Sequence, residues 1–189
     1  VVLEEKIQGP EVSVFALCDG ERYTLLPTAQ DHKRLNEKDT GPNTGGMGAY
    51  SPAPLLTEDY LDKIIKEIIE PTINELNKRN IDYRGVIYFG LMITKSGPKV
   101  IEYNCRFGDP ECQTIMPLMD QNFVFLLEKC SMGNLTGDEK INTSDKVSGC
   151  VIATSKGYPH EYKTGYQIKI DSQFYICLLY TSDAADEAI

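Results

Sequence analysis

An apolar run followed at once by a tight turn most constrains how this chain can fold. Residues Gly85 to Thr94 are nearly all apolar, which is typical of a strand buried on both faces. Residues Lys95 to Pro98 carry the Ser, Gly and Pro of a turn, and Lys99 to Asn104 has the pattern of a returning strand. The sequence therefore predicts a β-hairpin, and a sheet that is at least partly antiparallel.

Other segments carry local signals of helix, strand and loop. Thr57 is a good N-cap, and apolar residues recur at helical spacing as far as Leu76, with Pro71 expected to kink or split this helix. A second helix is expected from about Glu111 to Met132, and a long loop from Gln30 to Pro54. Further strands are predicted at Glu11–Leu17, around Arg22–Leu26 and at Val147–Thr154. The predicted fold class is α+β, a mostly antiparallel sheet with flanking helices.

The composition of the 189 residues excludes several classes of function. The formal net charge of −9 argues against a nucleic-acid partner, which needs a basic face, and against adhesion to anionic membranes. No apolar run is long enough to cross a bilayer, and no signal peptide is visible. The six cysteines form no CxxC pair, so reduced thiols in a cytoplasmic protein are expected.

The strand after the turn carries a pattern suited to phosphoryl chemistry. Alternate residues of a strand share a face, so Glu102, Asn104 and Arg106 are expected to point the same way, with Cys105 packed on the other face. A carboxylate beside an amide oxygen suits Mg²⁺, and Arg106 can reach a phosphoryl oxygen. On this pattern alone, the solvated face of an ordinary strand is an open alternative. The adjoining Phe107 to Glu111, a tight turn with two further acids, favours a site.

The segment between Gln30 and Pro52 contains a second pattern, Asp39-Thr40-Gly41-Pro42-Asn43-Thr44-Gly45-Gly46-Met47-Gly48. Glycines let backbone N–H groups approach an anion closely, and the nearby Lys33 and Arg34 add positive charge. A flexible surface loop is the alternative for this segment taken alone.

Residues Glu4 to Ser13 have the pattern of a strand end, a turn and a new strand. This segment resembles the hinge of the ATP-grasp fold, which holds adenine between two subdomains. The resemblance implies that Glu4 and the backbone near Ile7 meet the adenine edge, and that Glu11 accepts hydrogen bonds from the ribose hydroxyls. Lys6 departs from the apolar or aromatic residue expected beside adenine.

Taken together, the glycine-rich segment and the string from Asn104 to Glu111 resemble the phosphoribosylamine–glycine ligase family, within the ATP-grasp superfamily. The resemblance runs from about Val1 to Gly165. It implies ATP-dependent ligation of glycine to 5-phosphoribosylamine through a glycyl phosphate, in purine biosynthesis. No enzyme nucleophile is needed for this reaction.

The same resemblance implies roles for individual residues. Glu102 and Asn104 would bind Mg²⁺ or Mn²⁺, and Arg106 would stabilise the transferred phosphoryl group. The substrates glycine and 5-phosphoribosylamine would be held by Asp31, Lys33, Asn43, Gly45, Gly46 and Asp109. Many ATP-grasp relatives carry another metal-binding acid on the preceding strand, and none is present from Gly85 to Ile93.

The ends of the chain suggest a fragment. Residues 1–165 are expected to form part of an ATP-grasp domain, and residues 166–176 a truncated start of the C-terminal region. Residues 177–189 resemble a translated sequencing adapter. The fragment alone is expected to be inactive, because half of the ATP clamp would be missing. Two alternatives for the parent protein stay open: another ATP-grasp carboxylate–amine ligase, and a non-catalytic nucleotide-binding module.

Overall fold

A computed structural model describes residues 3–120, 122–139, 141, 145–167 and 169. Residues 170–189, which include the adapter-like tail, lie outside the described part. The elements follow the chain in this order: β1 (Glu11–Asp19), β2 (Tyr23–Leu25), β3 (Gln30–Asp31), β4 (Arg34–Asn36), β5 (Thr40–Asn43), β6 (Gly48–Ser51), α1 (Glu58–Ile64), the π-helical turn η1 (Ile65–Ile69), α2 (Glu70–Lys78), β7 (Arg84–Thr94), β8 (Gly97–Asn104), α3 (Glu111–Ile115), the 3₁₀ turn η2 (Met116–Leu118), α4 (Phe123–Met132) and β9 (Ser148–Val151).

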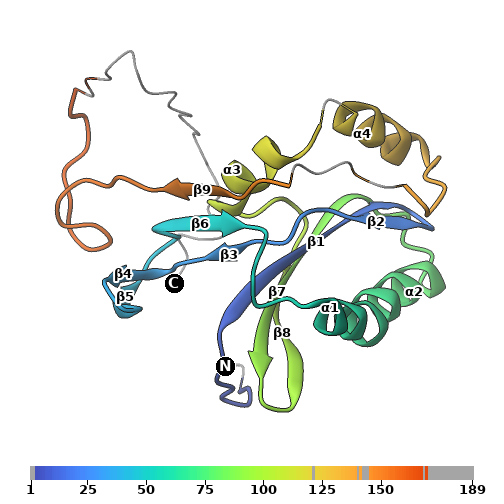
Figure 1. Cartoon of the computed structure of the whole chain (residues 1–189), viewed down its shortest axis with the longest axis horizontal. Helices are drawn as coiled ribbons and strands as arrows, with labels where there is room; N and C mark the ends of the chain where they lie inside the picture. Colours follow the sequence, from blue (N-terminus) through green and yellow to red (C-terminus); the bar gives the residue numbers. More distant parts are fainter. Residues whose placement is uncertain (1–2, 121, 140, 142–144, 168, 170–189) are drawn as a thin grey trace.

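The largest sheet has four strands in the order β2-β1-β7-β8, all antiparallel (Figure 1). β1 and β7 pair along the whole of β1, from Glu11 opposite Met92 to Asp19 opposite Arg84. β7 returns as β8 through the predicted turn, and its central residues are buried. The predicted hairpin is therefore confirmed. Smaller sheets join β3-β6-β9 and β4-β5.

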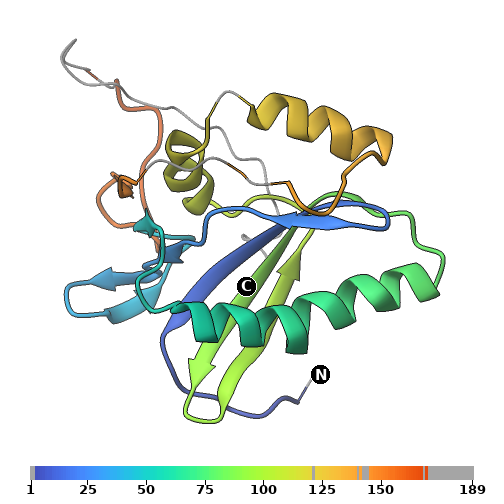
Figure 2. The same ribbon diagram turned by 45° about the vertical axis from the view of Figure 1, so that its right-hand side comes forward.

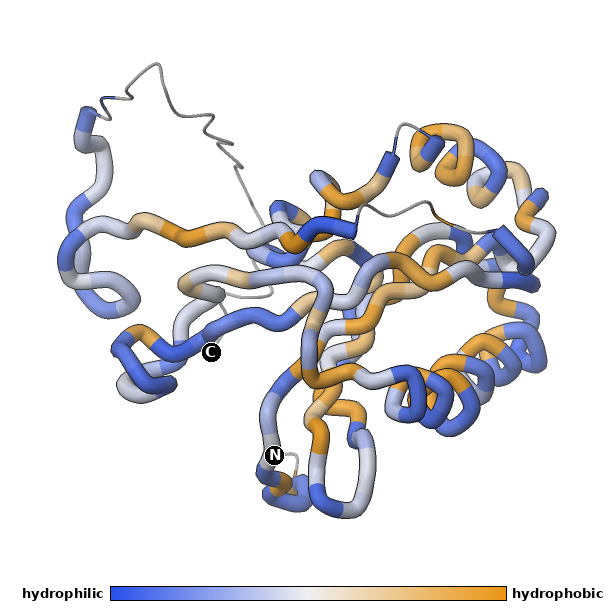
Figure 3. Tube along the Cα trace, viewed as in Figure 1, coloured by the Kyte–Doolittle hydropathy of each residue, from blue (hydrophilic) through white to orange (hydrophobic). Residues whose placement is uncertain are grey.

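Two hydrophobic clusters cover the two faces of the large sheet. On one face, Ile64 of α1 and neighbouring helical residues pack against Val14. On the opposite face, Ile115 of α3 and Leu126 of α4 pack against Phe15. Figure 2 shows the sheet between α4 on one side and the α1–α2 helix on the other, and Figure 3 shows the apolar strands between them. Helices on both faces of an antiparallel sheet confirm the α+β class.

The helix that follows Thr57 begins as predicted, because the Thr57 Oγ1 accepts a hydrogen bond from the Tyr60 N–H at 3.4 Å. It continues through α1, η1 and α2. Pro71 has no N–H, and its ring would clash with a carbonyl of the preceding α-helical turn. The wider π turn, in which the Glu70 N–H bonds to the Ile65 carbonyl, lies directly before Pro71. The predicted disturbance at Pro71 is this change of helix type.

Two expectations about secondary structure are wrong. The segment from Gln30 to Pro54 is not one loop, since it contains β3, β4, β5 and β6, whose backbones pair with one another and with β9. The expected helix from Glu111 to Met132 is broken into α3, η2 and α4. Pro117 lies in η2, and Met119 after it is extended, with φ −86° and ψ 144°. Within the described residues, no helix is long and apolar enough to span a membrane.

Candidate functional site

One face of the large sheet changes from apolar to polar along β1. Glu11, Ser13 and Phe15 share this face, because alternate residues of a strand point the same way. Phe15 belongs to the hydrophobic cluster beneath α3 and α4, whereas Ser13 lies beyond it and pairs with Gly90 of β7. The polar side chains of β1 therefore gather at the end of the sheet where β1 begins.

The pairing of β8 with β7 adds two predicted residues to the same face. Glu102 lies opposite Gly90, and Asn104 lies opposite Tyr88. The two side chains therefore point the same way, as the alternation predicted. Cys105 is exposed, so the expectation of a packed thiol was wrong.

Lys33 brings the polar residues of three strands together. Its Nζ lies 3.5 Å from Glu11 Oε2, 3.6 Å from Glu102 Oε1 and 4.0 Å from Asp31 Oδ2. Glu11 begins β1, Asp31 ends β3, and Glu102 lies within β8 near its end. Residues predicted separately as ATP, substrate and metal ligands thus meet around one ammonium group. We call Glu11, Asp31, Lys33 and Glu102 the Lys33 cluster.

Local hydrogen bonds hold Lys33 in this position. The Lys33 carbonyl accepts bonds from the Thr44 N–H at 2.7 Å and from the Thr44 hydroxyl at 2.8 Å. Two residues earlier, Asp31 pairs with Ala49 of β6. The glycine-rich segment therefore also has a structural role. It binds the Lys33 backbone and fixes the point from which the Lys33 side chain extends.

Burial and charge shift the pKa values inside the Lys33 cluster. Burial, reinforced by Glu111 and Glu11 and opposed by Lys33, raises the pKa of Asp31 to about 7. Burial lowers the pKa of Lys33, but the nearby carboxylates of Asp31, Glu11, Glu102 and Glu111 outweigh it and raise this pKa above its ordinary value. Lys33 therefore stays charged, and the ionisation of Asp31 falls in the neutral pH range.

A buried polar group beneath the cluster was missed from the sequence. The Ser13 hydroxyl donates a hydrogen bond to Glu111 Oε1 at 2.8 Å and lies 3.1 Å from the Tyr88 hydroxyl. Glu111 is 2% exposed, and its carboxylate lies so close to Gly108 that no Cβ would fit there. From the sequence, Glu111 was only one of two further acids in the turn after Phe107. Ser13, a polar residue at an inward position of an apolar strand, is the signal that could have revealed this network.

The space and the donor atoms around Glu102 and Asn104 fit a metal ion only in part. A Cβ on Gly90 would lie 2.7 Å from Glu102 Cγ, so the glycine leaves room for the carboxylate that crosses it. This explains why no acid stands on β7 at that position. Within the described part of the chain, no group of three or more His, Cys, Asp or Glu residues is arranged to hold a metal. One carboxylate and one amide fit Mg²⁺ or Mn²⁺ only when phosphates or waters complete the shell.

The glycine-rich segment also contacts the turn that follows β8. A Cβ on Gly46, at φ +132°, would collide with the Pro110 ring and would lie 3.4 Å from the Asp109 carbonyl oxygen. The Gly45 N–H donates to the Tyr158 hydroxyl at 3.1 Å. Gly45, Gly46 and Asp109 are therefore brought together.

The remaining predicted residues lie around this centre or away from it. Arg106 follows β8, and its Nη1 donates to the Phe107 carbonyl at 2.9 Å. Asn43 is exposed in the β4–β5 hairpin. Glu4 is exposed and Ile7 half-buried in the segment before β1, so neither joins the Lys33 cluster.

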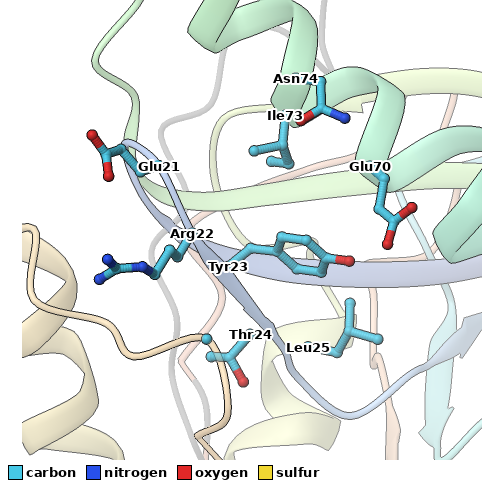
Figure 4. A pocket seen from close by; sticks show the side chains of 9 residues that line it. Glu21, Arg22, Tyr23, Thr24, Leu25, Glu70, Ile73 and Asn74 are labelled. Atoms are coloured by element: carbon cyan, nitrogen blue, oxygen red, sulfur yellow. The ribbon is translucent and has the colours of Figure 1, made fainter.

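A groove of about 530 Å³ lies elsewhere, between β2 and α2 (Figure 4). It is lined by Glu21, Arg22, Tyr23, Thr24, Leu25, Glu70, Ile73, Asn74 and Gly137. None of the predicted site residues lines it, and it combines exposed acids with one buried isoleucine. The Lys33 cluster, with its converging charges and shifted pKa values, is the stronger candidate site.

Comparison with known proteins gives the class of protein to which this chain belongs. Residues 1–112 match the family model "Phosphoribosylglycinamide synthetase, ATP-grasp (A) domain", so the chain is part of an ATP-grasp protein. A biotin carboxylase from Campylobacter jejuni, solved as a complex with β-γ-ATP, covers 77% of this chain and 30% of its own, with a TM-score of 0.54 and 20% identity. That likeness concerns the fold alone.

Within this class, the chain belongs to the phosphoribosylglycinamide synthetase family. The phosphoribosylamine–glycine ligase of Caldanaerobacter subterraneus subsp. tengcongensis is 48% identical over 169 residues, 89% of this chain and 40% of that protein. The trifunctional purine biosynthetic protein adenosine-3 of Gallus gallus is 46% identical over 168 residues, 89% and 17% of the two chains. The crystal structure of the Thermotoga maritima ligase has a TM-score of 0.78 at 32% identity, covering 89% of this chain and 42% of its own. The chain thus spans about two fifths of the length of the first relative.

Proposed function

We propose that the complete protein containing this chain uses ATP to join glycine to 5-phosphoribosylamine. ATP phosphorylates the glycine carboxylate to glycyl phosphate, and the amine of 5-phosphoribosylamine then displaces phosphate to give glycinamide ribonucleotide. The observation that carries the proposal is the Lys33 cluster, in which Glu11, Asp31 and Glu102 approach one ammonium group within 3.5–4.0 Å. The names of the similar ligases supply the substrates.

The residues would divide the work by their chemistry. Glu4 and the backbone at Ile7 would meet the adenine, and Glu11 the ribose hydroxyls. Glu102 and Asn104 would hold Mg²⁺ or Mn²⁺, which neutralises phosphate charge when bound. Arg106 would offer its planar guanidinium to the transferred phosphoryl group.

Positioning and charge would then account for catalysis, since no covalent enzyme intermediate is required. Lys33 would supply a positive charge to the anionic groups of the substrates. Asp31 and Asn43, with the backbone of Gly45 and Gly46, would line the substrate side. A cytoplasmic location is part of the same proposal.

The test is ADP release by the complete purified protein, with ATP, Mg²⁺, glycine and 5-phosphoribosylamine each omitted in turn. We expect release only when all four are present, and a loss of at least about 100-fold in kcat for Glu102→Gln, because a charged ligand to the phosphates is removed. Glu75→Gln, on the exposed face of α2, is the matched control and should leave the rate unchanged. Turnover without glycine, or with a different amino acid or amine preferred in a substrate panel, would contradict the proposal.

We also propose the domain division predicted from the sequence: residues 1–165 as part of the ATP-grasp domain, residues 166–176 as the start of the next region, and residues 177–189 as adapter-derived. Sequencing the gene again from unfragmented nucleic acid tests the last point. A natural reading frame that encodes residues 177–189 would reject it.

A further inference from the structure

The turn after β8 contains a paired carboxylate and amide that the proposed mechanism does not yet use. Gln113 lies four residues after Asp109, and its Nε2 donates a hydrogen bond to Asp109 Oδ1 at 2.6 Å. The other end of the amide, Gln113 Oε1, is buried without a hydrogen-bond partner among the described residues. Nearly all buried polar atoms in proteins are paired, so this exception needs a reason.

The carboxylate explains the orientation of the amide. Turning the Gln113 side chain over would place Oε1 against Asp109 Oδ1, and two acceptors with no hydrogen between them repel each other. The amide therefore keeps its donor on Asp109 and leaves its own oxygen unpaired. The hydrogen bond from Gln113 uses Oδ1 of Asp109 alone. Among the residues that the structure describes, none donates to Oδ2, which is therefore the oxygen to which a ligand would bind.

The same turn carries complementary charges three residues apart. Arg106 stands at its start, with the guanidinium tied to the Phe107 carbonyl, and Asp109 follows. Gly46 of the glycine-rich segment packs against Pro110 of the same turn. Thr44 of that segment donates a hydrogen bond to the Lys33 carbonyl. A free amino acid also carries both charges, a carboxylate and an ammonium group close together. The turn therefore offers the Asp109 carboxylate as an acceptor for an ammonium group.

We propose that Gln113 is a positioning residue that holds the Asp109 carboxylate as the acceptor for the ammonium group of the amino-acid substrate. This inference rests on the proposed function, in which that substrate is glycine. Gln113 itself need not touch glycine, because it acts through Asp109. The chemical class recognised by Asp109 is a primary ammonium group.

The test uses the complete protein and steady-state kinetics with glycine and ATP varied separately. We expect Gln113→Met, which keeps the side-chain length but removes the donor, to raise the glycine KM about tenfold and to change kcat and the ATP KM less than about threefold. In Gln113→Glu, two carboxylates share a proton at low pH and repel each other at high pH, so the glycine KM should rise steeply between about pH 6 and 8.5. The rise in Gln113→Glu should exceed any pH dependence of the wild-type glycine KM, to which Asp31 contributes with a pKa of about 7.

A variant that exchanges the carboxylate and the amide between positions 109 and 113 distinguishes a positioning role of Gln113 from a role in stability alone. Asp109→Asn combined with Gln113→Glu restores a hydrogen bond between the two side chains, with the amide now donating from the turn, but moves the negative charge away from the substrate. We expect it to restore thermal stability and not the glycine KM. Arg79→Met, which removes an exposed bond between residues four apart at the end of α2, is the control and should leave all constants unchanged.

The kinetic results distinguish a failure of this inference from a failure of the proposed function. An active wild type whose glycine KM stays within about twofold in Gln113→Met, or is restored by the exchange, overturns this inference and leaves the proposed function standing. A wild type without glycine-dependent ADP release overturns both. A parallel rise of the ATP and glycine KM values assigns Gln113 a structural role only, which also overturns the inference.

Discussion

At the scale of single residues, the site depends on one cation among several acids. Lys33 lies within 4.0 Å of Glu11, Asp31 and Glu102, and its side chain is 32% exposed. Because Asp31 is only 8% exposed, its charge is the one most sensitive to burial. The free protein therefore holds a carboxyl group whose ionisation opposes folding at high pH.

This leads to a prediction for the Asp31→Asn variant. A carboxyl pKa of about 7 in the folded state, above the ordinary 3.8, means that the folded form binds the proton more tightly. The stability that the protonated group contributes is present at low pH and lost as pH rises through 7. Thermal unfolding of the 189-residue chain should show the variant more stable at pH 8 by on the order of 2–4 kcal/mol, with little difference near pH 4.

The exposed Asp62 of α1 supplies the control, since Asp62→Asn makes the same chemical change at a carboxylate that is not buried. A constant difference between wild type and Asp31→Asn across this pH range would mean that Asp31 titrates normally.

At the scale of elements, the register of β7 with β8 decides where the candidate metal ligand lies. Glu102 crosses Gly90, and Asn104 lies opposite Tyr88, which places both donors on one face. The register irregularity between Gly90 and Leu91 lies directly beside this crossing. A strand pairing shifted by one residue would turn Glu102 toward the opposite face.

Gly90→Ala should therefore disturb the site although it adds one methyl group. Its Cβ would lie 2.7 Å from Glu102 Cγ and 3.1 Å from Tyr88 Cε1, so Glu102 must move. We expect a loss of about 1–3 kcal/mol in unfolding free energy and weaker Mn²⁺ binding, measured by calorimetry in the presence of an ATP analogue. Gly149→Ala, whose nearest contact would be 3.6 Å away, should change neither quantity. Equal effects of the two variants would contradict this account.

The start of α1 allows a prediction independent of the site. Removing the Thr57 hydroxyl in Thr57→Ala leaves the Tyr60 N–H without its cap, which costs about 1 kcal/mol of stability. Thr57→Ser keeps the oxygen and should retain most of the stability. Chemical denaturation measures both, and an alanine variant as stable as the serine variant would show that the cap contributes nothing.

At the scale of the whole molecule, two carboxyl groups make the stability depend on pH in opposite senses. Burial raises the pKa of Glu139, but hydrogen bonds from the Thr136 and Gly137 backbones, at 2.6 and 2.9 Å, outweigh it and lower the pKa to about 2. Its contribution is present above the ordinary value of 4.5 and lost as pH falls toward 2. Asp31 acts in the opposite sense, because its contribution is lost as pH rises toward 7.

A double variant, Asp31→Asn with Glu139→Gln, lacks both groups. The difference in stability between the wild type and this variant should therefore be largest near pH 4–5 and fall at lower and higher pH. Unfolding temperatures measured from about pH 2.5 to 8.5 test this. The single variants should each remove one side of the peak. A difference that does not vary with pH would refute the assignment of both groups.

The sequence by itself was enough for the elements whose signals are local. The apolar run of β7, the turn before β8 and the cap at Thr57 depend on neighbours along the chain, and all three are confirmed. The motif around Glu102 and Asn104 was visible for the same reason, since strand alternation is a local rule.

Tertiary structure alone decided what depends on contacts between distant segments. The residues from Gln30 to Pro54 look like a loop because their strands are short and turn-rich, and because β6 pairs with β9 about 100 residues away; the pairing energy overrides the local composition. The meeting of Lys33 with Glu11 and Glu102, and the bond from Ser13 to the buried Glu111, likewise join positions that no local pattern relates. Charge and burial act through space, so the site became a single electrostatic unit only in the folded chain.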